Sequence, residues 1–191
     1  MTQEEIIKEY EKKLKFPKTN PEVQIMICPI GTVASGKTTI IKPLSKKLSL
    51  LKISTDEIRK LFKENGHGYD SVKDLAYKLA DKYIGKGFSI AVDADCNSNG
   101  AQEKIKKLQE KYKIKVFWIH IKPPEEFIIN KLKSYKHTWL FRDANHAIEN
   151  YKSSKEGHKN INFNFIYTFD TSRDDLDKQI EECIDVIKEN H

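Results

Sequence analysis

Short apolar runs alternate along the chain with longer stretches in which apolar residues recur every three or four positions. The runs have the length and composition of buried strands, and they span residues 23–28, 50–53, 88–92, 114–121 and 165–169. In the stretches between them the apolar residues fall on one side of a helix. Five strands separated by helices predict an α/β domain of three layers with a mainly parallel, five-stranded sheet.

Helices are also predicted outside the simple alternation of strand and helix. Apolar residues recur at helical spacing over residues 3–15, before the first strand. After the second strand, Ser54 and Glu57 have the spacing of a capping box, so we expect a helix over residues 55–64. A polar, weakly periodic stretch over residues 133–160 follows the fourth strand. We interpret this stretch as a helical lid.

Composition narrows the class of protein. Charged residues make up 32% of the chain and hydrophobic residues 38%, as in an ordered domain that folds in water. No apolar run approaches the roughly 18 residues of a membrane span, and the N-terminal residues lack the apolar core of a signal peptide. The three cysteines are far apart and suggest neither a disulfide framework nor a zinc site. We expect one domain over residues 1–191, in the cytoplasm and without a membrane segment.

The net charge of +6 is unevenly placed along the chain. Ten lysines and four glutamates lie between Ala101 and His137, which gives this segment a charge of +6 and leaves the remainder neutral. Clustered basic charge suits a polyanionic partner such as a nucleic acid. A solvated, lysine-rich surface is the alternative, because lysine is abundant throughout the chain. Arginine is the rarer and more informative residue, since its planar fork binds phosphate bidentately.

One segment carries a phosphate-binding pattern. Residues 31–39 read Gly-Thr-Val-Ala-Ser-Gly-Lys-Thr-Thr, between a predicted strand and a predicted helix. This is the spacing of a Walker A loop, in which backbone N–H groups surround a triphosphate, the lysine reaches the outer phosphates and the next hydroxyl binds Mg²⁺. The pattern predicts the P-loop NTPase fold and an ATP or GTP donor. The expected nucleotide-binding residues of the loop are Gly31, Ser35, Gly36, Lys37, Thr38 and Thr39.

The helix after the second strand carries a carboxylate and a guanidinium three positions apart. Asp56 and Arg59 therefore face the same way, beyond the carboxyl ends of the strands where ligands bind in such sheets. A carboxylate that receives a hydroxyl proton, beside a cation that holds a substrate phosphate, is suited to phosphoryl transfer to an alcohol. The alternative is an acidic first turn with an ordinary ion pair.

Two carboxylates compete for the metal side of the site. Asp93 ends the third strand, in the position of a Walker B carboxylate that holds Mg²⁺ or orients Thr38. Asp95 follows two residues later. We expect Thr38 and Asp93 to hold the metal, with Asp95 as the competing choice.

The predicted lid and the end of the sheet supply further cations. The lid stretch and the helix before it hold Lys131, Lys133, Lys136 and Arg142. We expect Arg142 to clamp the transferring phosphate, because it is the arginine of this group, and a surface cation beside an acidic residue is the alternative. Arg173 follows the last strand and is expected beside the nucleotide base, or else at a solvated helix start.

Three segments together resemble the P-loop kinases of the polynucleotide-kinase group. They are residues 31–39, 54–59 and 92–94, and the resemblance runs over most of the chain. The group includes polynucleotide 5′-hydroxyl kinases, the kinase domains of tRNA ligases, seryl-tRNA kinases and zeta-toxin-like sugar-nucleotide kinases. Residues 29–33 look particularly like the kinase module of fungal-type tRNA ligases.

The resemblance implies a role for each matching residue. It implies that Lys37 and Thr38 bind phosphate and Mg²⁺, that Asp56 is the general base, and that Arg59 contacts a phosphate of the acceptor strand. It also implies that a lid arginine, here Arg142, stabilises the transferring phosphate. The leading hypothesis is an NTP-dependent kinase acting on a 5′-hydroxyl end of RNA or DNA. The alternatives are a kinase for a small metabolite or sugar nucleotide, and an NTP-binding switch that needs no acceptor base.

Overall fold

The computed structural model describes residues 1–19, 23–134 and 140–190. Its five strands form one sheet in the order β2-β3-β1-β4-β5, and every neighbouring pair is parallel. The strands are β1 (Ile25–Ile30), β2 (Leu51–Ser54), β3 (Ile90–Asp93), β4 (Lys115–Ile121) and β5 (Phe165–Phe169). The predicted five-stranded α/β sheet is confirmed.

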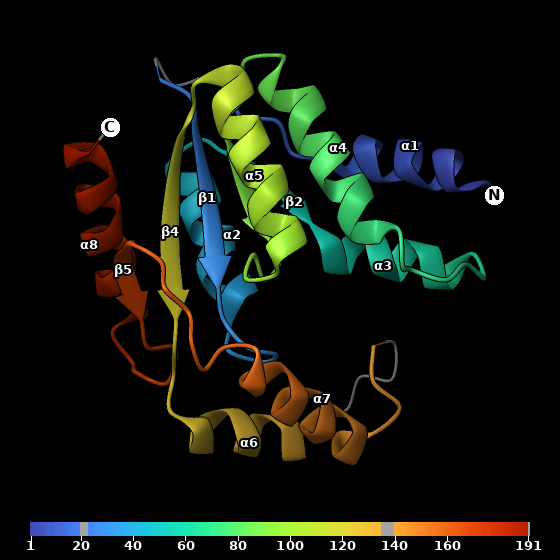
Figure 1. The fold of residues 1–191 in the computed structure, drawn as a ribbon, viewed down its shortest axis with the longest axis vertical. Coiled ribbons are helices and arrows are strands. Elements are labelled where there is room, and N and C mark those ends of the chain that lie inside the picture. The colour runs from blue at the N-terminus through green and yellow to red at the C-terminus, as the bar shows by residue number, and fades with distance from the viewer. Residues whose placement is uncertain (20–22, 135–139, 191) are drawn as a thin grey trace.

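Helices cover both faces of the sheet, which makes three layers (Figure 1). The helices are α1 (Gln3–Lys13), α2 (Lys37–Lys47), α3 (Thr55–Glu64), α4 (Val72–Ile84), α5 (Asn99–Tyr112), α6 (Glu125–Lys133), α7 (Ala144–Glu156) and α8 (Leu176–Glu189). In the described part of the chain, no helix is long and apolar enough to cross a bilayer.

The central strand β1 belongs to two hydrophobic cores because alternate side chains of a strand point to opposite faces. Met26, Cys28 and Ile30 pack in the core that lies under α1, α3, α4 and α5. Ile25 and Ile27 pack in the core under α2 and α8. Every residue of β1 is buried. The strand whose end carries the glycine loop is thus fixed from both sides.

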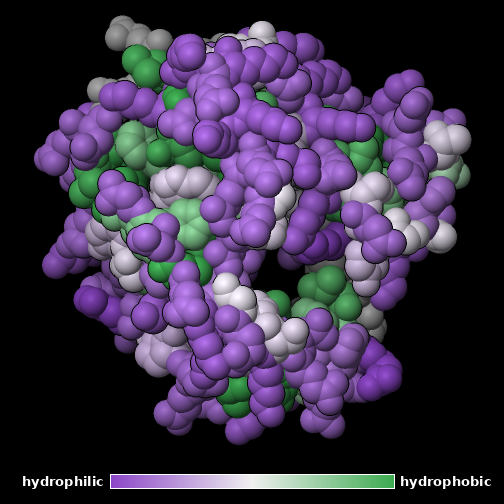
Figure 2. Space-filling model, in the orientation of Figure 1, coloured by the Kyte–Doolittle hydropathy of each residue, from purple (hydrophilic) through white to green (hydrophobic). Residues whose placement is uncertain are grey.

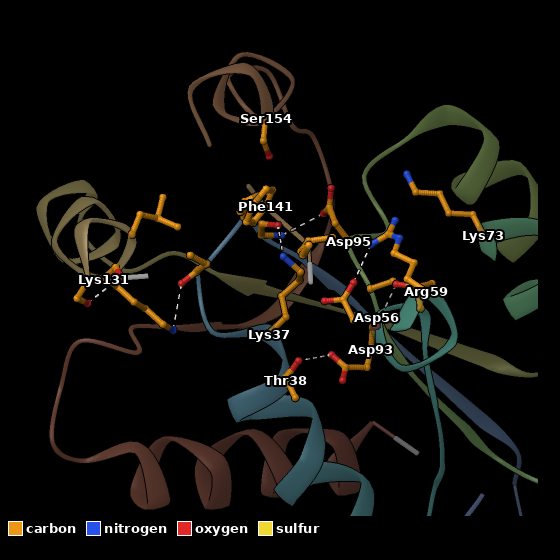
Figure 3. Close-up of a pocket in the computed structure, with 18 residues that line it drawn as sticks. Lys37, Thr38, Asp56, Arg59, Lys73, Asp93, Asp95, Lys131, Phe141 and Ser154 are labelled. Atoms are coloured by element: carbon orange, nitrogen blue, oxygen red, sulfur yellow. Dashed lines mark hydrogen bonds and ion pairs between the residues drawn. The ribbon is translucent and has the colours of Figure 1, made fainter. Parts of the chain in front are cut away.

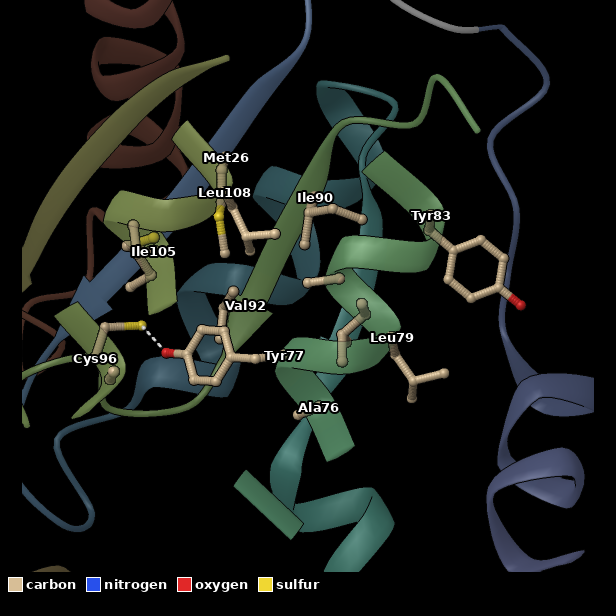
Figure 4. Close-up of a cluster of buried hydrophobic side chains, with 14 of the residues drawn as sticks. Met26, Ala76, Tyr77, Leu79, Tyr83, Ile90, Val92, Cys96, Ile105 and Leu108 are labelled. Atoms are coloured by element: carbon tan, nitrogen blue, oxygen red, sulfur yellow. Dashed lines mark hydrogen bonds between the residues drawn. The ribbon is translucent and has the colours of Figure 1, made fainter. Parts of the chain in front are cut away.

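The core under α4 and α5 contains two polar groups that meet (Figure 4). The hydroxyl of Tyr77 donates a hydrogen bond to the sulfur of Cys96 over 3.7 Å. Burial raises the pKa of the Cys28 thiol, as does its neighbour Cys96. The three cysteines are buried and free, in keeping with the expected absence of a disulfide framework.

The first strand starts two residues later than its apolar run predicts. The run begins at Val23, but this residue is 41% exposed and the ladder to β4 begins at Ile25. The strand continues through Pro29 to Ile30. A strand buried on both faces has no apolar–polar alternation to mark its ends, which is why the sequence places them loosely.

The helix α3 begins at Thr55, as the capping signal predicts. The side chain of Ser54 accepts a hydrogen bond of 3.4 Å from the backbone N–H of Glu57. The carboxylate of Glu57 does not complete the box, because it pairs instead with Lys52 over 2.5 Å. A second contact fixes the start of α3, because the backbone N–H of Ser54 donates a hydrogen bond of 2.8 Å to the buried hydroxyl of Tyr10 on α1.

The lid predicted over residues 133–160 contains α7, which packs on α6, and both helices lie beyond the carboxyl ends of the strands (Figure 1). This unit has a small core of its own, in which α6 packs on α7. The buried members of that core are Ile128, Leu132, Phe141, Ala147 and Tyr151. Val33 and Ala34 of the glycine loop pack against them. The loop and the lid are therefore in direct contact.

Candidate functional site

The glycine loop has a backbone that only particular residues allow. Gly36 is the N-cap of α2 and has a φ of 97°, a value that glycine adopts without strain. A Cβ at Gly36 would lie 2.9 Å from Cγ2 of Thr171, so there is no room for a side chain at this position. The hydroxyl of Thr171 donates to the carbonyl of Ser35 over 2.7 Å. Through this contact, the segment after β5 holds the loop closed.

Lys37 lies inside this loop. Its ammonium donates hydrogen bonds of 2.8 Å to the carbonyls of Gly31 and Thr32. Burial lowers the pKa of Lys37, although the carboxylates of Asp95, Asp56 and Asp93 act in the opposite direction. The amine is thus held where the loop backbone, the start of α2 and three acidic side chains meet. Such a position suits a cation that binds phosphate oxygens.

Thr38 and Asp93 are brought together as predicted. The hydroxyl of Thr38 donates a hydrogen bond of 2.9 Å to Oδ1 of Asp93. The other oxygen, Oδ2, is buried 3.7 Å from the ammonium of Lys52 and accepts no hydrogen bond from the residues that the structure describes. Burial raises the pKa of Asp93, and the nearby carboxylate of Asp56 adds to the effect, against Lys52 and Thr38.

These two side chains fit a Mg²⁺ ion bound together with a nucleotide. The carboxylate of Asp93, whose Oδ2 is buried without a hydrogen bond from the described residues, and the hydroxyl of Thr38 are the hard oxygen donors that Mg²⁺ prefers. Within the described ranges, no group of three His, Cys, Asp or Glu side chains is placed to hold a metal by itself. A site of one or two protein ligands completed by phosphate oxygens and water is the arrangement typical of Mg²⁺ with NTPs.

Asp56 and Arg59 face each other across the first turn of α3. Oδ1 of Asp56 lies 2.7 Å from a terminal nitrogen of Arg59, and both side chains are partly exposed. The carboxylate keeps its second oxygen toward the cavity side of the helix start (Figure 3). The predicted pair therefore forms, at the edge of the space in front of the glycine loop.

One cavity of about 720 Å³ joins the loop, the metal-side carboxylate and the acceptor-side pair. Its wall includes Gly31, Lys37, Thr38, Asp56, Arg59, Asp93 and Asp95. The lid closes the opposite side with Lys131, Leu132 and Phe141, and Ser154 of α7 also lines it (Figure 3). Figure 2 shows a largely hydrophilic face that is hollowed between the lid and the body of the molecule. A volume of this size suits a small ligand or the end of a larger one.

The lid cation at the cavity is a lysine. Lys131 of α6 lines the cavity, its ammonium donates to the carbonyl of Ala34 over 3.3 Å, and burial lowers its pKa. Arg142 is not in the cavity wall. Its side chain is 80% exposed and pairs with Asp143 over 3.0 Å at the start of α7. The predicted clamp is therefore not at the phosphate site in this structure, because capping of α7 by Asp143 directs it away.

The remaining predicted residues have different surroundings. Ser35 is buried and supports the loop, whereas Thr39 is exposed on α2 and is not in the cavity wall. Arg173 is 60% exposed and pairs with Asp175 next to α8. Lys136 lies outside the described residues. Arg173 is thus engaged by a carboxylate two residues further along the chain, and it is not among the residues that line the cavity.

Two side chains have no signal in the sequence, one in the cavity wall and one behind it in contact with Asp95. Lys73, in the first turn of α4, lines the cavity beside Arg59 (Figure 3). His158 follows α7 and contacts Asp95 over 3.3 Å. Neither belongs to a motif, and both reach the site only because α4 and α7 pack beside the strand ends. Asp95 is thus engaged by His158 and by the backbone N–H of Gly31, which favours Asp93 as the metal-side carboxylate.

Comparisons with known proteins identify a family and related folds. The sequence matches the AAA domain family over residues 26–147, which includes the glycine loop, Asp56, Asp93 and α6. None of the curated proteins matches the chain. Many solved structures resemble the fold.

Three solved structures illustrate the likeness. An APS kinase of Mycobacterium tuberculosis in complex with AMPPNP and APS has 14% identity and a TM-score of 0.59, covering 88% of this chain and 99% of its own. A putative kinase from Chloroflexus aurantiacus has 15% identity and a TM-score of 0.64, with coverages of 86% and 98%. The PezAT toxin–antitoxin structure from Streptococcus pneumoniae has 15% identity and a TM-score of 0.60, with coverages of 97% and 96%. The architecture is that of P-loop kinases.

Proposed function

This chain belongs to the AAA domain family, and on that premise we propose that it is a kinase that transfers the γ-phosphate of ATP or GTP to a hydroxyl group. The observation that carries the proposal is that one cavity is lined both by Lys37 and Thr38 of the loop and by Asp56 and Arg59. A protein that only binds or hydrolyses NTP needs the first pair alone. The second pair supplies an acceptor side.

The donor side would be held by the loop. The free N–H groups of the loop after Gly31 and the ammonium of Lys37 bind the phosphates, and the partial positive charge at the start of α2 favours them further. Thr38 and Asp93 would hold Mg²⁺, which supplies positive charge to the phosphate oxygens during transfer. Lys131 approaches from the lid and excludes water from the same space.

On the acceptor side, Asp56 orients the attacking hydroxyl and accepts its proton, while Arg59 keeps the carboxylate in place. Phosphoryl transfer passes through a loose transition state, so the proton leaves late and a weak base suffices. The ion pair of 2.7 Å fixes one oxygen of Asp56 and leaves the other for the hydroxyl. The residues thus act mainly by position, as this chemistry requires.

We infer that the acceptor is a 5′-hydroxyl end of RNA or DNA. Support comes from Arg59 and Lys73, two cations on the acceptor side that fit the phosphate following a 5′-terminal nucleoside. The basic segment between Ala101 and His137 gives less support than its composition predicts. Its described lysines are spread over α5, β4, α6 and the connections between them, and three of these lysines pair with acidic side chains: Lys104 with Asp74, Lys106 with Glu110 and Lys111 with Asp81.

A small anionic alcohol is the second candidate acceptor. The lid encloses the cavity at the loop, which suits a compact substrate, and one structural neighbour is described as an APS kinase in complex with AMPPNP and APS. The same two cations would then bind the anionic group of that molecule. The reaction and the residue roles are unchanged between the two candidates.

Transfer of label from γ-labelled ATP or GTP tests both. We expect labelling of 5′-hydroxyl RNA or DNA oligonucleotides, and no labelling of matched 5′-phosphate strands. Absence of transfer to any oligonucleotide, with transfer to a small phosphorylated alcohol, would favour the second candidate. Absence of both would reject the kinase proposal.

The acceptor base is tested by Asp56→Asn. We expect transfer to fall at least about 100-fold while nucleotide affinity stays within about threefold. Glu64→Gln removes a carboxylate from the other end of the same helix and serves as the matched control, with activity retained. Transfer that survives Asp56→Asn would remove Asp56 from the mechanism.

A further inference from the structure

A partly buried ion pair joins the end of the lid to the base of the glycine loop. Asp95 follows β3, and its Oδ1 accepts a hydrogen bond of 3.2 Å from the backbone N–H of Gly31. The Nε2 atom of His158, just beyond α7, lies 3.3 Å from both carboxylate oxygens. The side chain of His158 is 10% exposed. A second contact docks the same segment, because the Asn97 side chain donates to the carbonyl of Gly157 over 2.7 Å.

The surroundings of His158 identify its charge state. Its Nδ1 atom lies 2.7 Å from the carbonyl oxygen of Ser154, which can only accept a hydrogen bond, and Nε2 faces the carboxylate of Asp95. A ring with an acceptor at each nitrogen donates from both, and a histidine that does so is an imidazolium. Burial lowers the pKa of His158, but its bonds to Asp95 and Ser154 raise it by more.

The charge of Asp95 creates a problem for phosphate binding. The cavity already contains the carboxylates of Asp56 and Asp93, and Asp95 is a third one next to the loop. A triphosphate entering this space is repelled by each carboxylate that lacks a counter-charge, and the repulsion is strong where water is excluded. Arg59 compensates Asp56, and Lys52 lies 3.7 Å from Asp93, which a bound Mg²⁺ would compensate further. The positive charge of Lys37 is also needed by the phosphates. His158 is therefore the counter-charge that remains for Asp95.

We propose that His158 is a positioning residue that neutralises Asp95 and holds it against the N–H of Gly31, so that nucleotide binding depends on docking of the end of α7. The inference rests on the proposed function, because it assumes that the loop binds an NTP. It assigns to the lid a second role besides covering the site. The lid would prepare the loop electrostatically before a nucleotide arrives.

Nucleotide affinity, measured by calorimetry with Mg·ATP on the full chain, tests this without any acceptor. His158→Gln keeps a hydrogen-bonding side chain but removes the positive charge, and we expect the Kd to rise about tenfold. Lys152→Gln removes one positive charge from the exposed side of α7 and is the matched control. Its Kd should stay within about twofold of the wild type.

The double variant Asp95→Asn/His158→Gln separates charge from architecture. Removing the carboxylate as well removes the need for a counter-charge, while the amide can still accept from Gly31. We expect the double variant to recover to within about threefold of wild-type affinity. A merely structural contact predicts instead that the double variant binds as weakly as His158→Gln or more weakly, and that result would overturn the proposal.

If the His158→Gln variant does not fold, the single variant Asp95→Asn still tests the proposal. We expect this variant to bind Mg·ATP at least as tightly as the wild type, because the repelling charge is gone. Weaker binding by Asp95→Asn would contradict the proposal and point to a direct role for Asp95. This experiment measures nucleotide affinity. Phosphate transfer is measured in a separate assay, and its absence would count against the proposed function and not against this inference.

Discussion

The hydroxyl of Thr38 donates a hydrogen bond of 2.9 Å to Oδ1 of Asp93, and this contact joins the first turn of α2 to the end of β3. The two residues lie 55 positions apart in the sequence. Their contact places a hydroxyl and a carboxylate at the same edge of the sheet, next to Lys37. The first prediction concerns this pair.

Asp93→Asn removes the charge of the metal-side carboxylate while keeping its shape. We expect about 10- to 100-fold more Mg²⁺ to be required for half-maximal transfer, since ligand and near-ligand changes typically alter metal affinity by this factor. A magnesium titration of initial rates measures it. Asp174→Asn, at an exposed position before α8, is the control. An unchanged magnesium requirement in Asp93→Asn would exclude Asp93 from the metal site.

Gly36→Ala tests the shape of the loop. The new Cβ would sit 2.9 Å from Thr171 on a residue with a φ of 97°, so both steric overlap and backbone strain oppose it. We expect a free energy of unfolding lower by about 2–4 kcal/mol, and loss of nucleotide binding.

Gly66→Ala is the matched control for that measurement. Gly66 has a φ of 73°, but a Cβ there would have no neighbour within 4 Å. We expect a cost of only about 1 kcal/mol, from backbone strain alone, with binding retained. Equal costs in thermal or denaturant unfolding would show that Thr171 does not constrain the loop.

Lys131→Ala and Arg142→Ala compare the two candidate lid cations. Lys131 contacts the loop at the Ala34 carbonyl, whereas Arg142 pairs with Asp143 outside the cavity. We expect Lys131→Ala to lower kcat about 100-fold, as loss of one charge-stabilising donor does, and Arg142→Ala to change it less than threefold. The reverse order of effects would mean that the lid carries Arg142 into the site during turnover, as the sequence predicts.

The docking of α1 onto α4 has a predictable pH dependence. The carboxylate of Glu11 binds the ammonium of Lys82 over 2.5 Å and the hydroxyl of Tyr83 over 2.9 Å. Burial raises the pKa of Glu11, but the bonds from Lys82 and Tyr83 outweigh burial, and the pKa of Glu11 lies below the ordinary 4.5. Ionised Glu11 therefore stabilises the folded state above about pH 4.5, and this contribution disappears as the pH falls through the lowered pKa.

Glu11→Gln should accordingly lower the free energy of unfolding by about 1 kcal/mol at pH 7. The difference from the wild type should shrink as unfolding is measured at progressively lower pH below 4.5. Glu4→Gln changes an exposed carboxylate of the same helix, and it should have little effect on the free energy of unfolding at pH 7 or below pH 4.5. A difference that stays constant with pH would mean that the charge of Glu11 does not hold α1.

Much of the fold follows from local sequence signals. Each strand is a short apolar run, and the capping pair at Ser54 and Glu57 marks the start of α3 to the residue. The glycine loop is equally local, since its spacing alone specifies a strand, a turn and a helix. The ends of β1 were placed less well, because a run buried on both faces carries no periodicity.

In the site, too, some residues can be predicted from local sequence and others depend on long-range packing. The carboxyl ends of parallel strands meet at one edge, so the sequence could bring Thr38, Asp56 and Arg59 together with Asp93. Among the lid cations it favours Arg142, because arginine is the rarer residue there, but nothing local in the sequence tells which cation faces the loop. The packing of α6 and α7 against Val33 and Ala34 sets which side chain faces the loop, and it directs Lys131 inward and Arg142 outward.

The sequence by itself therefore determined the P-loop architecture, the phosphate-binding loop and the residues that follow each strand, because these depend on contacts within one or two neighbouring elements. Only the tertiary structure decided which charges the site contains. Asp95 and His158 are 63 residues apart, on elements that no motif connects. Their pairing arises from the way α7 returns across the strand ends, and the charge of a buried group depends on such neighbours rather than on its own position in the chain.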